Sequence, residues 1–124
     1  MSKKQDHLDN GIKQMMALND DISDCRTEVS LSSTRPVWEP QNGTFKLLEI
    51  TKNIVKQLGQ PFLHASAGGG SDGNFTGAMG VPTLDGLGVS GDKTHTLHEH
   101  IEVASLEMRT KLMMALLLSI NEEF

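Results

Sequence analysis

The sequence predicts an α/β fold in which helices and short strands alternate. Apolar residues recur at helical spacing in three long segments, and two short apolar runs each end in a cluster of glycines. A further segment alternates apolar and polar residues, as a half-buried strand does. The order helix, strand, helix, strand, helix is typical of layered α/β proteins with parallel strands. A chain of 124 residues is long enough for one domain with a modest core.

The first expected element is a helix over residues 2–18. Leu8, Ile12, Met15 and Met16 recur at steps of three and four residues. A stripe of this kind predicts that the helix packs one face against a core.

A strand is expected next, over residues 25–33. Thr27, Val29 and Leu31 alternate with polar residues there. Arg35 and Pro36 end the strand, because proline lacks the backbone N–H that a sheet ladder requires. Residues 36–40 then form a stiff connector, in which Trp38 is expected to be a packing residue.

The clearest helix is expected over residues 44–58, with Gly59 and Pro61 ending it. Its apolar stripe follows helical spacing through Phe45, Leu48, Thr51, Val55 and Leu58. Short buried strands are expected at 62–65 and 81–84, and a short helix at 72–79 lies between them. Ser71 or Asp72 caps that short helix.

The last helix is expected over residues 105–121. Its apolar residues cover more than one face, which is typical of a helix buried on two sides. Two short core strands cannot make a stable sheet alone, so the chain is expected to be part of a larger fold or assembly.

Composition excludes several classes of protein. The net charge is −5 and no cluster of Lys and Arg is present, so nucleic-acid binding is not expected. The one cysteine, Cys25, cannot form an intrachain disulfide and fits a reducing compartment. The first ten residues lack the apolar region of a signal peptide, and no apolar run approaches the ~20 residues of a membrane span. We therefore expect a cytoplasmic protein that does not contact a membrane.

A glycine-rich loop, residues 68–73, joins an expected strand to an expected helix. Backbone N–H groups at such a junction attract anions. The loop lacks the Lys-Ser/Thr ending of a phosphate-binding P-loop and the glycine spacing of a dinucleotide fingerprint. These residues leave two interpretations of the loop: a nest of backbone N–H groups that binds a carboxylate, and a tight structural turn.

Histidines 95, 98 and 100 lie near Glu99 and Glu102, and imidazole and carboxylate groups suit zinc. Their spacing matches no self-contained zinc motif, so His95 as a single ligand, completed from elsewhere, is the preferred interpretation. Arg35 could bind a carboxylate with its two-pronged guanidinium or could be an ordinary surface residue. Activation of Cys25 as a nucleophile is not expected.

Four motifs occur together in the following order: Ser33-Thr34-Arg35-Pro36, Gly68-Gly69-Gly70-Ser71-Asp72-Gly73-Asn74-Phe75, Val81-Pro82-Thr83-Leu84-Asp85-Gly86-Leu87-Gly88, and His95-Thr96 followed by His98-Glu99. Together they resemble the C-terminal part of the M20-family zinc metallohydrolases. This group contains carboxypeptidase G2-like glutamate carboxypeptidases, acetylornithine deacetylase and succinyl-diaminopimelate desuccinylase.

The resemblance implies how the chain is organised. Residues 1–36 would be the last helix and strand of a lid, or dimerisation, domain. Residues 37–124 would be the C-terminal part of the catalytic α/β domain, arranged as helix, strand, helix, strand, helix. The chain would be a fragment, and it would form a homo-oligomer or associate with the missing N-terminal part.

The resemblance also implies site residues. His95 would be one ligand of the two zinc ions, and Arg35 would bind the substrate carboxylate. The substrate pocket would be lined by the loop residues Gly69, Gly70, Ser71, Asp72, Gly73 and Asn74. The family's other zinc ligands, its bridging aspartate and its general-base glutamate precede the lid, so no catalytic residue is expected here.

The expected function is that of a zinc-dependent amidohydrolase or metallopeptidase. It would hydrolyse an amide bond in N-acyl amino acids or in the C-terminal residues of peptides, and this fragment would be inactive alone. Two alternatives are a non-catalytic module that works by association and a module that binds a small anion at the glycine loop.

Overall fold

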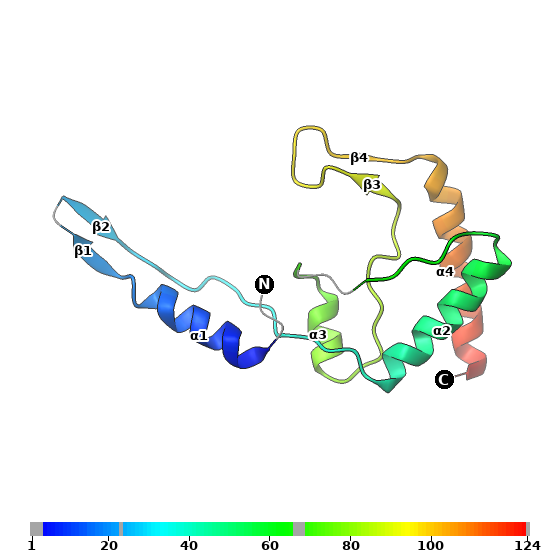
Figure 1. The fold of residues 1–124 in the computed structure, drawn as a ribbon, viewed down its shortest axis with the longest axis horizontal. Helices are drawn as coiled ribbons and strands as arrows, with labels where there is room; N and C mark the ends of the chain where they lie inside the picture. Colours follow the sequence, from blue (N-terminus) through cyan, green and yellow to red (C-terminus); the bar gives the residue numbers. More distant parts are fainter. Residues whose placement is uncertain (1–3, 23, 66–68, 124) are drawn as a thin grey trace. The chain divides into compact units, whose positions relative to one another are not determined.

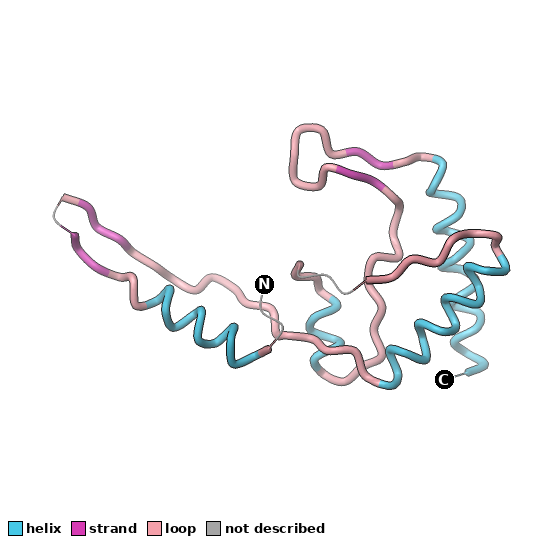
Figure 2. Tube along the Cα trace, viewed as in Figure 1, coloured by secondary structure: helices cyan, strands magenta, loops and turns pink. Residues whose placement is uncertain are grey.

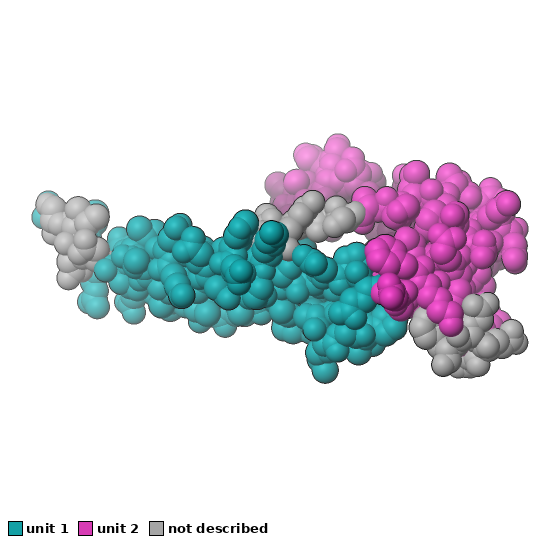
Figure 3. All heavy atoms as spheres, turned by 60° about the horizontal axis from the view of Figure 1, so that its bottom comes forward, with its two compact units in different colours: residues 1–41, 66–83 teal, residues 42–65, 84–124 magenta. Residues whose placement is uncertain are grey.

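The computed structural model describes residues 4–22, 24–65 and 69–123. Figures 1 and 2 show its elements, which in chain order are α1 (Gln5–Met16), β1 (Asp20–Ile22), β2 (Cys25–Thr27), α2 (Asn42–Gln57), α3 (Gly73–Ala78), β3 (Gly91–Asp92), β4 (His100–Ile101) and α4 (Ala104–Glu123). The chain forms two compact units, coloured in Figure 3. Unit 1 contains residues 1–41 and 66–83, and unit 2 contains residues 42–65 and 84–124.

Unit 1 begins with α1, which confirms the first expected helix. The core face expected for this helix is wrong, because no residue of α1 is buried. Leu8 and Ile12 are half-buried, whereas Met15 and Met16 are exposed. An apolar stripe needs a surface to pack against, and the described part of unit 1 does not cover this one.

A short hairpin follows α1. β1 and β2 pair antiparallel, with Asp20 opposite Thr27 and Ile22 opposite Cys25. The strand expected through Ser33 ends at Thr27. The Asn19 side chain explains this early end. It accepts a hydrogen bond from the Val29 N–H at 2.6 Å and donates one to the Val29 carbonyl at 3.0 Å, so these backbone groups do not extend the ladder.

The short helix α3 completes unit 1 and lies where it was expected. Gly80 follows it with φ of 84°, a left-handed conformation that glycine adopts without steric cost. The Val81 N–H donates to the Thr76 carbonyl and the Gly80 N–H to the Gly77 carbonyl, both at 3.1 Å. These two bonds form the glycine-terminated turn that commonly ends helices.

Unit 2 is organised by the packing of α2 against α4. Its buried apolar residues are Ile50, Ile54 and Val55 of α2 and Leu112 and Leu116 of α4. The helix α2 ends at Gln57, and Gly59 terminates it as expected, with φ of 68° and the same pair of turn hydrogen bonds that follows α3. Phe45, placed on the core stripe by the sequence, is instead half-exposed at 52%.

The helix α4 confirms the last expected helix, and it presents two apolar faces with different environments. Leu112 is 2% exposed and Leu116 is 3% exposed, where they pack in the core. The opposite face carries exposed apolar side chains: Leu106, Met113, Met114, Leu117 and Leu118. We call Met113, Met114, Leu117 and Leu118 the outer apolar face of α4. Nothing in unit 2 covers this face among its described residues.

The expected strands at 62–65 and 81–84 are wrong, because both segments are loops. A strand exists only where a neighbour accepts and donates ladder hydrogen bonds, and neither segment pairs with another described strand. The parallel arrangement is also wrong for the strands observed, since β1–β2 and β3–β4 are both antiparallel. The mixture of helices and small sheets is consistent with the α/β class. In the described residues, no helix is long and apolar enough to cross a membrane.

Candidate functional site

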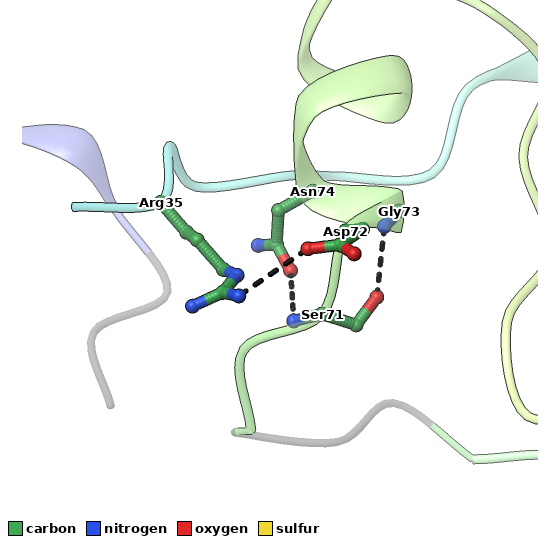
Figure 4. A network of polar contacts seen from close by, with 5 residues as sticks. All are labelled: Arg35, Ser71, Asp72, Gly73 and Asn74. Atoms are coloured by element: carbon green, nitrogen blue, oxygen red, sulfur yellow. Dashed lines mark hydrogen bonds and ion pairs between the residues drawn. The ribbon is translucent and has the colours of Figure 1, made fainter. Parts of the chain in front are cut away.

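An ion pair joins Arg35 to the glycine-rich loop within unit 1 (Figure 4). Arg35 lies in the extended segment after β2, immediately before Pro36. Its Nη2 atom donates to Oδ1 of Asp72 at 3.2 Å. The Arg35 side chain is 46% exposed and that of Asp72 is 92% exposed. The guanidinium is therefore positioned at the start of α3 and remains accessible to solvent.

Hydrogen bonds between neighbouring residues shape the loop at the start of α3. The Ser71 Oγ atom accepts a hydrogen bond from the Gly73 N–H, and Oδ1 of Asn74 accepts one from the Ser71 N–H, both at 2.9 Å. This reciprocal pattern is similar to a capping box, although the Ser71 hydroxyl bonds the second N–H after it rather than the third, and the side chains satisfy N–H groups that the helix cannot. Ser71 is thus the side-chain cap, one of the two candidates from the sequence, and Asp72 makes no capping bond.

Two further contacts hold the segment around Arg35 against α3. Nδ2 of Asn74 donates to the Pro36 carbonyl at 2.8 Å. The Trp38 ring lies directly on Gly77, which is buried, and a β-carbon at that position would overlap the ring. Trp38 is therefore a packing residue, as expected. Both contacts are made within three residues after Arg35, so they hold the backbone next to the point from which its side chain reaches Asp72.

Gly69 shows no steric need for glycine among the residues that the structure describes. A β-carbon built at this position meets no described atom within 4 Å, and its φ is not left-handed. Gly68, the preceding residue of the motif, lies outside the described residues. The absence of an internal reason for glycine is compatible with close approach by a ligand or by another polypeptide segment.

His95 belongs to unit 2, on the loop that joins β3 to β4. It is exposed, and its φ of 66° is left-handed. Histidine is one of the few β-carbon-bearing residues enriched in that conformation. The His95 N–H donates to Oε2 of Glu99 at 3.0 Å, and the Thr96 N–H donates to the Lys93 carbonyl at 3.1 Å. The loop backbone is thus held by hydrogen bonds within the loop.

The histidines near His95 do not converge on one point. His98 and His100 are exposed, and Nδ1 of His100 lies 2.9 Å from the His98 carbonyl oxygen. In the described part of the chain, no group of three or more His, Cys, Asp or Glu residues is arranged to hold a metal ion. His95 can therefore supply one ligand, but these residues do not form a zinc centre by themselves.

A shallow hollow of about 350 Å³ also lies in unit 1. It is lined by Gln5, Val37, residues 39–41, Gly77 and Ala78. None of the residues predicted for the site lines it.

The predicted site residues thus fall into two groups. The structure brings Arg35 together with Ser71, Asp72 and Asn74 in unit 1, and it places His95 in unit 2. The contact of Asn74 with the Pro36 carbonyl and the contact of Glu99 with His95 were not predicted. The second could have been suspected, because the two residues are four apart in a short loop.

Comparison with known proteins gives three findings. The sequence model described as "Peptidase family M20/M25/M40" matches residues 6–119. The uncharacterized protein YqjE of Bacillus subtilis (strain 168) is 29% identical to the chain over 92 residues, which cover 74% of the chain and 24% of YqjE. The chain therefore matches about a quarter of the length of this curated relative. No solved structure shows a significant match.

Proposed function

Because the chain belongs to peptidase family M20/M25/M40, we propose that it is the C-terminal segment of a zinc-dependent amidohydrolase or metallopeptidase. Membership supports a hydrolase of the metallopeptidase or amidohydrolase type at the level of the family. The finer proposal rests on the four motifs that resemble the glutamate carboxypeptidase and deacylase group. The substrate would be an N-acyl amino acid or a peptide whose free carboxylate is recognised.

The observation that carries this proposal is the position of Arg35. Its guanidinium lies at the start of α3 on a backbone that the Pro36 and Trp38 contacts hold in place. Arginine binds a carboxylate with two parallel hydrogen bonds, which gives both attraction and orientation. In this proposal Arg35 binds the substrate carboxylate, and the loop from Gly69 to Asn74 lines the pocket.

The metal part of the proposal assigns only one ligand to this chain. His95 would contribute an imidazole, and the remaining ligands and the general base would come from residues outside these 124. A bound zinc ion would supply Lewis-acid activation of the amide and of water. The described residues do not complete such a centre, so this chain's own role is to bind the substrate and contribute His95.

A second candidate function is association without catalysis, and the outer apolar face of α4 favours it. Leu117 is 61% exposed and Leu118 is 72% exposed, and exposed apolar side chains grouped on one helix mark interaction surfaces. In either function we propose that this face binds the N-terminal part of the enzyme or a second copy.

The single exposed thiol of Cys25 supports a reducing, cytoplasmic compartment.

The test of the proposed function is binding of N-acetylglycine to the 124-residue chain, followed through the arginine side-chain NMR signals. We expect the Arg35 signal to respond to N-acetylglycine but not to N-acetylglycinamide, which lacks the carboxylate. Arg35→Lys should weaken binding because it removes the two-pronged geometry. Arg109→Lys, the same substitution in α4, is the matched control and should bind as the wild type does. Equal responses to the acid and the amide would contradict a carboxylate-binding role.

A further inference from the structure

We propose that Asp72 is an internal ligand of Arg35, which the carboxylate of the substrate displaces. Asp72 thereby sets how tightly the site binds carboxylates. The proposal rests on the function proposed above, in which Arg35 binds the substrate carboxylate, and it adds a specificity-determining residue to that site. Asp72 is a positioning residue because it acts through Arg35.

The geometry of the ion pair is that of a contact which a better ligand can replace. A guanidinium carries five N–H donors and can pair with both oxygens of a carboxylate. The contact between Arg35 and Asp72 joins only Nη2 to Oδ1, and its 3.2 Å exceeds the ~2.7–2.9 Å typical of charge-assisted hydrogen bonds. A substrate carboxylate that approaches in plane can make two such bonds.

Because both partners are exposed, replacing Asp72 by the substrate carboxylate at Arg35 costs little free energy. The Asp72 side chain is 92% exposed, so its carboxylate is already hydrated and loses little when it leaves Arg35. Exposed pairs of this kind contribute little to stability. The pair is therefore strong enough to orient the Arg35 side chain toward the loop, but too weak to exclude a ligand that binds through two hydrogen bonds.

The remaining loop contacts do not use the Asp72 side chain. The helix start is capped by Ser71 and Asn74, and Asn74 also holds the Pro36 carbonyl. Rotation of the Asp72 carboxylate into solvent therefore leaves the backbone of the loop in place. After the exchange, its negative charge still lies close to the bound ligand and opposes it.

The expected consequence is that removing this charge strengthens binding. Asp72→Asn keeps the size of the side chain but removes both the competing ligand and the repulsion. Since an exposed pair contributes up to about 1 kcal/mol and 1.4 kcal/mol is tenfold in affinity, we expect N-acetylglycine to bind about two- to fivefold more tightly. Binding of N-acetylglycinamide should not change.

The experiment compares four forms of the 124-residue chain by NMR titration of the arginine side-chain signals. These are the wild type, Asp72→Asn, Asp72→Glu and Asp85→Asn. Asp72→Glu keeps the competing charge and should bind N-acetylglycine within about twofold of the wild type. Asp85→Asn is the matched control, because it removes the same charge from an exposed aspartate in unit 2. It should also bind as the wild type does.

The outcomes separate this proposal from the one on which it rests. Weaker or unchanged binding of N-acetylglycine to Asp72→Asn, with the wild type binding at Arg35, overturns the exchange and leaves the proposed function standing. Equal strengthening in Asp72→Asn and Asp85→Asn also overturns it, because net charge then explains the gain. Absence of any Arg35 response in all four forms overturns the proposed function, and the exchange with it.

Discussion

Substitution of Leu112 tests whether α2 and α4 form the core of unit 2. Leu112 is 2% exposed and packs in a cluster with Ile50, Ile54, Val55 and Leu116. Leu112→Ala removes three carbon atoms from the centre of that cluster. The substitution should therefore lower the free energy of unfolding of the chain.

The magnitude follows from the size of the core. Buried Leu→Ala substitutions cost about 2–5 kcal/mol, and the loss is smaller where neighbours can collapse into the cavity. Only five apolar residues of unit 2 are buried among the described residues, and half-buried Leu58 and Phe62 border them. Collapse is easy in so small a core, so we expect a loss of about 2–3 kcal/mol. Against a total of 5–15 kcal/mol for a typical domain, this is a large fraction.

The assay is urea unfolding followed by circular dichroism at low protein concentration, where association contributes least. The matched control is Leu117→Ala, the same substitution on the same helix but at a side chain that is 61% exposed. Its free energy of unfolding should stay within about 0.5 kcal/mol of the wild type. Equal losses for the two variants, or a loss below about 1 kcal/mol for Leu112→Ala, would refute the assignment of the two faces of α4.

Three further predictions concern association, metal binding and pH. By sedimentation, the chain should be a dimer or larger species at micromolar concentration. The double substitution Leu117→Lys, Leu118→Lys should shift it toward monomer, because it places charge on the outer apolar face. A compact wild-type monomer would count against this face as an interface. By calorimetry, zinc should bind weakly to the wild type and more weakly still to His95→Ala. The chain should not hydrolyse N-acetyl amino acids when zinc is added, and turnover that disappears in His95→Ala would show that it carries a complete catalytic site. The hydrogen bond and the positive charge of Lys111 lower the pKa of the Glu107 carboxyl. The pair therefore stabilises α4 at pH values above the ordinary pKa of glutamate, and this stabilisation is lost as the pH falls through the lowered pKa of Glu107. In an NMR titration Lys111→Gln should raise the Glu107 pKa; an unchanged value would refute the contact.

The helices could be predicted because their signals are local. Periodicity and end signals located α2 within about two residues of its observed bounds. Gly59 terminates the helix in a left-handed conformation, which residues with a β-carbon adopt less easily than glycine. Burial was less predictable, since it depends on what lies opposite each stripe. Phe45 has the right spacing for the core but nothing in the described part of unit 2 buries it fully.

Apart from β2, which begins at Cys25 as expected, the strands could not be predicted, because a strand is a relation between two segments. Residues 62–65 have a strand-like apolar composition, but no described strand lies beside them to form a ladder. The two hairpins that do form were missed because their strands are two or three residues long. Side-chain hydrogen bonds also competed with strand pairing. The Asn19 side-chain amide bonds both the N–H and the carbonyl of Val29, and this interaction spans ten residues of sequence.

The site illustrates the same division between local and non-local information. The loop cap at Ser71 was readable from the sequence, because its partners lie within three residues. The ion pair between Arg35 and Asp72 spans 37 residues and was not predicted, although each residue had been assigned to the site separately. Gly69 is the remaining clue, since neither its backbone conformation nor its described neighbours require glycine. Glycine costs conformational entropy on folding. In the proposed function, this glycine leaves room for the substrate beside the Arg35 contact.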